Sequence, residues 1–138
     1  MKKLLKGVGL VFIGLLVIGV LFGEAEPAEP EIIEYQQTSI ATMHKELTEN
    51  AMKAEQNYND KYVEITGYVV SIDSDGEYFS ITHTNEWYDF ESVLCNFSTE
   101  EQKEKFVNNY KTGSKITVKG KITDVGEILG YSLKIKEI

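Results

Sequence analysis

The sequence contains no arginine, so all 14 of its basic residues are lysines. The 22 acidic residues outnumber them and leave a formal net charge of −8. Lysine cannot make the two-pronged contacts through which a guanidinium group binds phosphate or guanine. Proteins that hold phosphate backbones are ordinarily basic. Both features argue against nucleic acid as the main partner.

Cysteine occurs once, at Cys95, so the chain cannot form an internal disulfide and its fold must depend on a packed core. The spacing puts Cys95 on the same face of an expected strand as Val93 and Phe97. We expect a small core residue at this position. The alternative is a reactive or intermolecular thiol, but no adjacent histidine or lysine in the sequence favours a lowered pKa.

The sequence also lacks the motifs of common enzyme classes, such as a nucleophile elbow, a phosphate-binding loop or a paired cysteine and histidine. His44 and His83 have no carboxylate at metal-ligand spacing, and we expect His44 to be solvated. Residues 73–76, Asp-Ser-Asp-Gly, resemble part of a calcium loop, but the distal glutamate is missing, so a hairpin turn is the better interpretation. We expect no enzyme activity, no metal and no cofactor.

A long apolar run is present only at the N-terminus. Lys2, Lys3 and Lys6 precede the uncharged apolar residues 7–23, and the chain becomes acidic at Glu24. This is the charge order of an export signal, or of an anchor whose lysines stay in the cytoplasm. The run is at the lower limit for crossing the ~30 Å hydrocarbon core.

We therefore expect residues 1–23 to form an uncleaved transmembrane anchor. A cleaved signal peptide is the first alternative and a buried core helix is the second. If the anchor is uncleaved, we expect a single-pass protein of the cell membrane with its C-terminal domain outside the cytoplasm. If the signal is cleaved, we expect a secreted protein.

The only two prolines lie in residues 24–38, together with five glutamates, which favours an extended, self-repelling linker. From Ser39 to about Tyr58, apolar residues recur at intervals of three and four, which predicts one amphipathic helix with Ser39 or Thr38 as its N-cap. These apolar residues are Ile40, Met43, Leu47, Ala51, Ala54 and Tyr58. The expected helix and everything after it make up a domain of residues 39–138.

Period-two alternation predicts the first strand within residues 57–73, where Val63 and Ile65 alternate with polar residues and Gly67 marks a bend. Two more strands follow at 77–84, with Phe79 and Ile81 inward, and at 89–97. The last two strands are expected at 114–125, bent at Gly120, and at 127–137, with Gly126 making the turn between them. Leu129, Tyr131, Leu133 and Ile135 share one side of the last strand.

Between the third and fourth strands, Ser98 and Glu101 have the spacing of a capping box that opens a short helix. Its predicted apolar side consists of Phe106, Val107 and Tyr110. This order of elements is mainly β with two helices. It predicts a five-stranded OB-fold barrel, β-β-β-α-β-β, preceded by an N-terminal α-helix and the hydrophobic N-terminal segment.

Three stretches carry a resemblance to a known family. They are residues 47–69, which include Tyr-Val-Glu-Ile-Thr-Gly-Tyr-Val at 62–69, then residues 93–97 and residues 113–121. In these stretches the chain resembles the tRNA_anti-like family of bacterial OB-fold proteins, over residues 39–138 and mostly at core and glycine positions. The resemblance implies an OB barrel in an exported or membrane-attached protein. The resemblance implies no catalytic residues, because the family pattern contains none.

The second and third strands of an OB fold, with the flanking turns, form its usual ligand face. Aromatic groups near that face could stack on a sugar, a base or a side chain of a partner. The candidate ligand-binding residues are Tyr68, Tyr78, His83, Trp87 and Tyr88. Trp87 is the strongest of them, because a tryptophan in a polar connection has no obvious core role. The alternative is that these side chains pack within the fold or lie on the surface without a ligand.

We expect a membrane-anchored, extracytoplasmic binding module that recognises a protein or a cell-envelope component. The alternative function is binding of single-stranded nucleic acid, which an OB fold permits. A candidate basic stripe, made of Lys115, Lys119 and Lys121 on the fourth strand and Lys134 and Lys136 on the fifth, would serve it. The same lysines fit an ordinary solvated exterior or a contact with anionic lipid or wall polymer. The ligand and the oligomeric state stay open.

Overall fold

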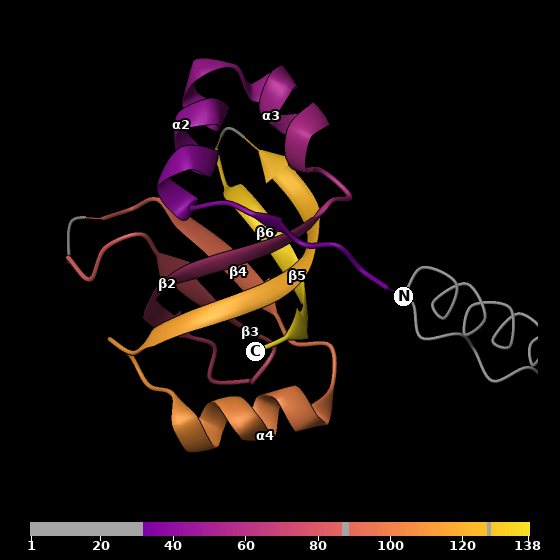
Figure 1. Cartoon of the computed structure of the whole chain (residues 1–138). Helices are drawn as coiled ribbons and strands as arrows, with labels where there is room; N and C mark the ends of the chain where they lie inside the picture. Colours follow the sequence, from indigo (N-terminus) through magenta and orange to yellow (C-terminus); the bar gives the residue numbers. More distant parts are fainter. Residues whose placement is uncertain (1–31, 87–88, 127) are drawn as a thin grey trace, which may run out of the picture. The chain divides into compact units, whose positions relative to one another are not determined.

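The computed structural model describes residues 32–86, 89–126 and 128–138, and it shows a barrel with helices at two opposite ends (Figure 1). The predicted anchor, residues 1–23, lies outside the described residues, as do Trp87 and Tyr88. No helix in the described part of the chain is long and apolar enough to cross a membrane. The elements are β1 (Gln36–Gln37), α2 (Ile40–Glu49), α3 (Ala51–Tyr58), β2 (Tyr62–Ile72), β3 (Tyr78–Thr82), β4 (Ser92–Asn96), α4 (Glu100–Asn109), β5 (Lys115–Gly126) and β6 (Gly130–Glu137).

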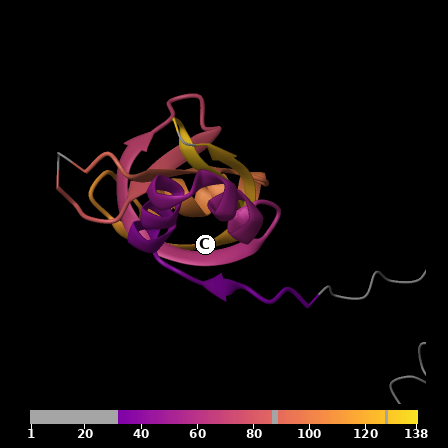
Figure 2. The ribbon, with the colours of Figure 1, turned by 90° about the horizontal axis from the view of Figure 1, so that it is seen from above.

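Five strands, β2 to β6, close the barrel. β3 pairs antiparallel with β2 and with β4, β4 pairs in parallel with β6, and β5 pairs antiparallel with both β6 and β2. The helix α4 lies between the third and fourth barrel strands, which is the OB-fold order. The predicted fold class is confirmed. Figure 2 shows α2 and α3 lying over one end of the barrel.

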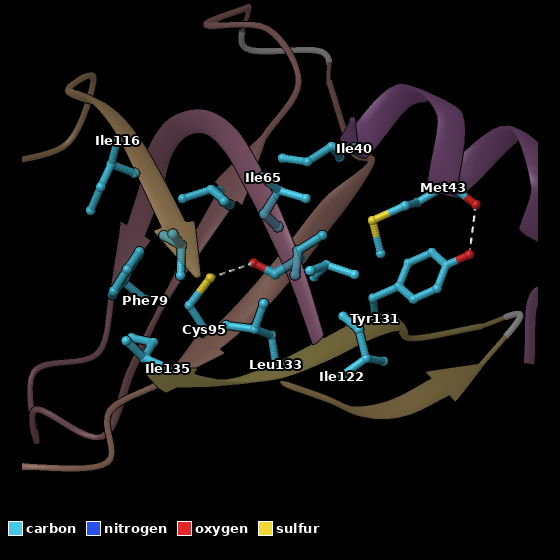
Figure 3. Close-up of a cluster of buried hydrophobic side chains, with 14 of the residues drawn as sticks. Ile40, Met43, Ile65, Phe79, Cys95, Ile116, Ile122, Tyr131, Leu133 and Ile135 are labelled. Atoms are coloured by element: carbon cyan, nitrogen blue, oxygen red, sulfur yellow. Dashed lines mark hydrogen bonds between the residues drawn. The ribbon is translucent and has the colours of Figure 1, made fainter. Parts of the chain in front are cut away.

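The core forms where the inward faces of the strands meet. Val63, Ile65, Phe79 and Ile81 are buried, as the period-two pattern predicts. Figure 3 shows side chains from β2, β3, β4, β5 and β6 meeting those of α2. The Tyr131 hydroxyl of β6 donates a hydrogen bond to the Met43 carbonyl oxygen at 2.6 Å, so the covering helix is fixed to the barrel by a polar contact as well as by packing.

The prediction of one helix over residues 39–58 was wrong, because Asn50 divides it into α2 and α3. Asn50 has extended backbone angles, and its N–H donates to the Glu46 carbonyl at the end of α2. Its side-chain oxygen accepts from the Lys53 amide at 3.2 Å and caps α3. Asparagine is a strong N-cap, and here the cap prevails over the continuous apolar spacing. Ser39 caps α2, as predicted.

The capping box of α4 lies one residue later than predicted. The N-cap is Thr99, whose hydroxyl accepts from the Gln102 amide at 3.2 Å, and the Gln102 side chain accepts from the Ser98 amide at 2.7 Å. Phe106, predicted on the apolar side of this helix, is buried, whereas Val107, also predicted there, is 75% exposed. Successive side chains of a helix point about 100° apart, so Phe106 and Val107 cannot both face the same narrow contact.

Several strand ends differ from the prediction. Residues 57 and 58 belong to α3, β5 ends one residue later than predicted, at Gly126, and the register of β2 against β3 shifts between Val69 and Ser71, just after the bend predicted at Gly67. In β5 the register does shift at Gly120, as predicted. The last strand begins at Gly130, whose φ of +77° ends the turn. Leu129, predicted to lie inward on that strand, therefore belongs to the turn and is 85% exposed.

Ordered pairing starts before residue 39, the expected start of the domain. Gln36 and Gln37, placed in the linker by their composition, form β1 and pair in parallel with Val63 and Glu64 of β2. The Gln37 side chain also donates to the Glu64 carboxylate at 3.0 Å. The end of the expected linker is thus part of the fold.

Candidate ligand-binding site

The structure brings some of the predicted ligand residues together and separates others. Tyr68 of β2 and His83, which follows β3, line the same hollow. Tyr78 lies at the opposite end of β3 and does not line that hollow. Trp87 and Tyr88 lie outside the described residues.

The hollow has a volume of about 270 Å³ and opens beside the start of α2. We call it the Tyr68 hollow. Tyr68 pairs with Thr82 of β3 and with Lys115 of β5, so the wall combines β2, the first residue of β5 and the residue that follows β3. One aromatic ring, one imidazole, one ammonium group and three hydroxyl groups surround it. They belong to Tyr68, His83, Lys115, Thr38, Ser39 and Thr66.

Gly67 completes the wall and explains why α2 begins here. A Cβ on Gly67 would lie 2.6 Å from the Thr82 carbonyl oxygen and 2.7 Å from Ile40 Cδ1. Only glycine allows β3 and the first residue of α2 to approach β2 so closely. Gly67 therefore has a packing role, which also fixes Ser39 at the edge of the hollow.

The predicted basic stripe is divided by ion pairs. Lys119 Nζ lies 3.6 Å from a Glu64 carboxylate oxygen and 3.9 Å from one of Glu137. Lys121 Nζ lies 3.9 Å from Asp60 Oδ1. Lys115, Lys134 and Lys136 make no ion pair within residues 32–86, 89–126 and 128–138; they are exposed. Lys115 alone lines the Tyr68 hollow.

Tyr78 belongs to a second arrangement, on the outer face of β3, β4 and β6. Tyr78 pairs with Asn96, and Asn96 pairs with Lys134, so the three side chains form one row across three strands. Lys136 follows on the same face of β6. We call this set the Tyr78 row. It occupies the usual OB-fold ligand face and has one aromatic ring and two ammonium groups.

His44 is not a solvated residue, so that prediction was wrong. Its Nε2 lies 2.9 Å from the Ser92 carbonyl oxygen and its ring meets Tyr131 edge-on at 5.4 Å between centroids. The residue is half-buried because α2 packs on the turn that precedes β6 and on the start of β4. The sequence showed only that His44 follows the buried Met43, which does not reveal this contact.

Cys95 is buried in the core, as predicted. Burial raises the pKa of the Cys95 thiol far above its ordinary value, because a thiolate would lose its hydration there. Its Sγ lies 3.8 Å from the Val93 carbonyl oxygen. Among the described residues, no group of three histidine, cysteine or acidic side chains is placed to hold a metal ion.

Comparison with known proteins agrees with this geometry. The sequence model of the tRNA_anti-like family matches residues 1–130. A solved protein described as a "putative nucleic acid-binding lipoprotein" from Klebsiella pneumoniae is similar over 75% of this chain and 92% of its own, with 24% identity and a TM-score of 0.53. This likeness supports the OB fold. No curated protein matches the sequence.

Two further solved structures resemble the chain more weakly. A "putative aspartyl-tRNA synthetase" from Leishmania major matches 83% of this chain and 22% of its own, with 13% identity and a TM-score of 0.49. The Stn1-ten1 complex of S. pombe matches 55% of this chain and 54% of its own, with 18% identity and a TM-score of 0.39.

Proposed function

Since the chain belongs to the tRNA_anti-like family and folds as an OB barrel, we propose that it is a non-catalytic binding module of the cell envelope. One observation carries the proposal: Tyr68, His83 and Lys115 come from different parts of the sequence and line a single hollow. OB barrels as a class bind oligosaccharides and oligonucleotides, usually on the face where the Tyr78 row lies. The ligand is a component of the envelope or a protein within it.

The order of charged and apolar residues at the N-terminus supports an outward location. Lysines 2, 3 and 6 before the apolar residues 7–23 favour attachment to the membrane with the barrel outside the cytoplasm. The Klebsiella protein is described as a lipoprotein, which supports an envelope location for this chain too. The only cysteine here, Cys95, is buried, so residues 7–23 would supply the attachment.

The chemistry of the Tyr68 hollow suits one ring of a sugar polymer. The Tyr68 ring offers an apolar surface for the face of a sugar, and hydroxyl groups of Thr38 and Thr66 offer hydrogen-bonding partners. Lys115 can balance one carboxylate. The net charge of −8 opposes binding of a polymer that carries many negative charges. We therefore propose an uncharged or sparsely charged envelope glycan.

Single-stranded nucleic acid is the second candidate. The name of the Klebsiella protein favours it, and the Tyr78 row has the aromatic ring and ammonium groups that such binding uses. The comparisons thus favour nucleic acid, whereas the acidic charge and the ion pairs of Lys119 and Lys121 favour an uncharged ligand. The two candidates use different surfaces, so they can be separated.

The test compares two probes on the full-length chain held in nanodiscs of zwitterionic lipid. Chitotetraose represents a glycan and a 12-nucleotide thymidine strand represents single-stranded DNA, each titrated calorimetrically at low and moderate salt. We expect chitotetraose to bind, Tyr68→Ala to weaken it by about tenfold, and the matched variant Tyr78→Ala to leave it unchanged. Salt-sensitive binding of the thymidine strand that is lost in Tyr78→Ala would replace the first candidate by the second.

A further inference from the structure

A hollow with a volume of about 500 Å³ shares no lining residue with the Tyr68 hollow. Its walls come from α2 and α3 on one side, from residues 90–92, which lead into β4, on another, and from residues 128–130, which lead into β6. We call it the Phe90 groove. Its size is within the range of sites that hold a few side chains or a small ligand.

Three large apolar side chains at this groove are almost fully exposed. Phe90 is 84% exposed, Ile128 is 89% and Leu129 is 85%, and all three line the groove. Single exposed apolar residues are common, but neighbouring ones around a hollow mark a contact surface. Covering such side chains would gain about 25 cal/mol for each Å² removed from water.

The walls of the groove are held in place by contacts of their own. The Asp89 carboxylate accepts hydrogen bonds from the Thr84 amide and hydroxyl, both at 2.8 Å, which anchors the chain next to Phe90. Burial raises the pKa of Asp89, but these bonds and one from the Glu91 amide outweigh it, so that its pKa lies below the ordinary value. The groove is therefore largely preformed.

The opposite wall depends on Gly130. Its φ is +77°, and a Cβ at this position would lie 3.2 Å from His44 Cε1 and 3.3 Å from the Ser92 carbonyl oxygen. Those two atoms belong to the groups joined by the His44–Ser92 hydrogen bond. Glycine lets the turn with Ile128 and Leu129 approach α2 and β4.

Charge indicates what covers the groove. Among its lining residues Glu91 is the only acidic one, and none is a lysine. Residues 32–138 carry 18 acidic residues against 11 lysines. A second copy of the chain or an anionic lipid surface would meet a charge of its own sign, whereas a cationic partner would be attracted.

We propose that the Phe90 groove binds a peptide segment of a partner protein that combines apolar side chains with lysine or arginine. The apolar side chains cover Phe90, Ile128 and Leu129, and a basic group lies near Glu91. This site is separate from the Tyr68 hollow and adds a protein contact to the proposed ligand binding.

The test uses the full-length chain in zwitterionic nanodiscs and a library of random 12-residue peptides displayed on phage. We expect enriched peptides to combine leucine, isoleucine or phenylalanine with lysine or arginine. The most enriched peptide is then synthesised with a fluorescent label. Its affinity should fall at least about tenfold in the double variant Phe90→Ser/Leu129→Ser and about threefold in Glu91→Gln. Val107→Ser, which removes an exposed apolar side chain from α4, is the matched control and should bind normally.

Four outcomes would overturn the proposal. They are a library without enrichment, enriched peptides that are acidic, equal affinity for the double variant, and a concentration-dependent dimer in sedimentation that the double variant abolishes. The last would assign the groove to a second copy. Urea denaturation of each variant, which should match the wild type, separates a lost contact from a lost fold.

Discussion

The two ends of the barrel are covered by helices in different ways. At one end α4 inserts Phe106, whose ring stacks on Phe79 at 4.3 Å between centroids and meets Phe97 at 5.4 Å. At the other end α2 is fixed by polar groups on aromatic rings, with the Tyr131 hydroxyl bound to the Met43 carbonyl oxygen and the His44 ring to that of Ser92. The α4 end is thus held mainly by ring contacts, whereas α2 adds these two hydrogen bonds to the packing of its own apolar residues Ile40, Met43 and Leu47.

The two proposed binding sites both lie at the α2 end of the barrel. Residues of the α2 end, Ser39 and His44, line the Tyr68 hollow and the Phe90 groove respectively. A hollow of about 300 Å³ also lies beside α4, and there the Gln102 side-chain amide donates to the Ile135 carbonyl oxygen and ties the helix to β6. We infer that the α4 end mainly stabilises the fold and that the α2 end mainly binds.

The largest effect is expected at the α4 end. Phe106→Ala removes a ring that is buried among three other aromatic rings, and should lower the free energy of unfolding by about 3–5 kcal/mol. Urea denaturation followed by circular dichroism measures it. The neighbouring Val107→Ala is the matched control and should stay within about 0.5 kcal/mol. Equal losses of unfolding free energy in both variants would contradict the claim that the packing of Phe106 stabilises the α4 end of the barrel.

A smaller loss is expected at the α2 end, where Gly67 lets the helix approach. Gly67→Ala places a Cβ against the Thr82 carbonyl and Ile40, and should cost about 1–3 kcal/mol of unfolding free energy. Gly126→Ala is the control, since its Cβ would meet the nearest atom at 3.9 Å. Its stability should be unchanged or higher by up to about 1 kcal/mol. A Gly67→Ala protein as stable as the wild type would show that α2 can move aside.

Cys95 pairs with Phe79 and so lies near the aromatic cluster that Phe106 of α4 joins. Burial raises the pKa of its thiol, so the unfolded thiol ionises from about pH 8.5 upward while the folded thiol stays protonated. The contribution of this thiol to the free energy of unfolding is therefore fully present below that pH. Above it, the free energy of unfolding falls by up to about 1.4 kcal/mol per pH unit. Urea denaturation between pH 8 and 10 should show this slope in the wild type. A Cys95→Ala protein with the same slope would refute the attribution.

The smallest effect on stability is expected where we propose binding. Phe90→Ser/Leu129→Ser changes two side chains that are mostly exposed, and should alter the free energy of unfolding by no more than about 0.5 kcal/mol. Thermal unfolding by calorimetry is a suitable measurement. A loss beyond about 1 kcal/mol would mean that these residues support the α2 end instead of serving a partner.

The sequence predicted the barrel well because alternation in strands such as β3 reports burial directly. It failed where a single residue decides between two local structures. Asn50 ends one helix and caps the next, and Thr99 instead of Ser98 caps α4. Leu129 has the period of β6 but lies before Gly130, whose positive φ sets the start of the strand.

The candidate site was harder to predict for a different reason. Tyr68 and His83 were chosen for their chemistry, and the fold brings them together with Lys115 from another predicted set. The pairing of the strands decides which side chains meet at the hollow, and one sequence does not show the register in which the strands pair. The same holds for His44, whose partner Ser92 is 48 positions away. The ion pairs of Lys119 and Lys121 also depend on pairing, so the stripe looked continuous in the sequence.

The measurement that tests the central claim most directly is an NMR titration. The ¹⁵N-labelled full-length chain in zwitterionic nanodiscs would be followed by amide chemical shifts as chitotetraose is added. We predict shifts around the Tyr68 hollow, at residues 38–39, 66–68, 83 and 115, with α4 unchanged. Shifts confined to α4 or to the Tyr78 row, or no shifts at all, would contradict the claim that the α2 end of the barrel binds the ligand.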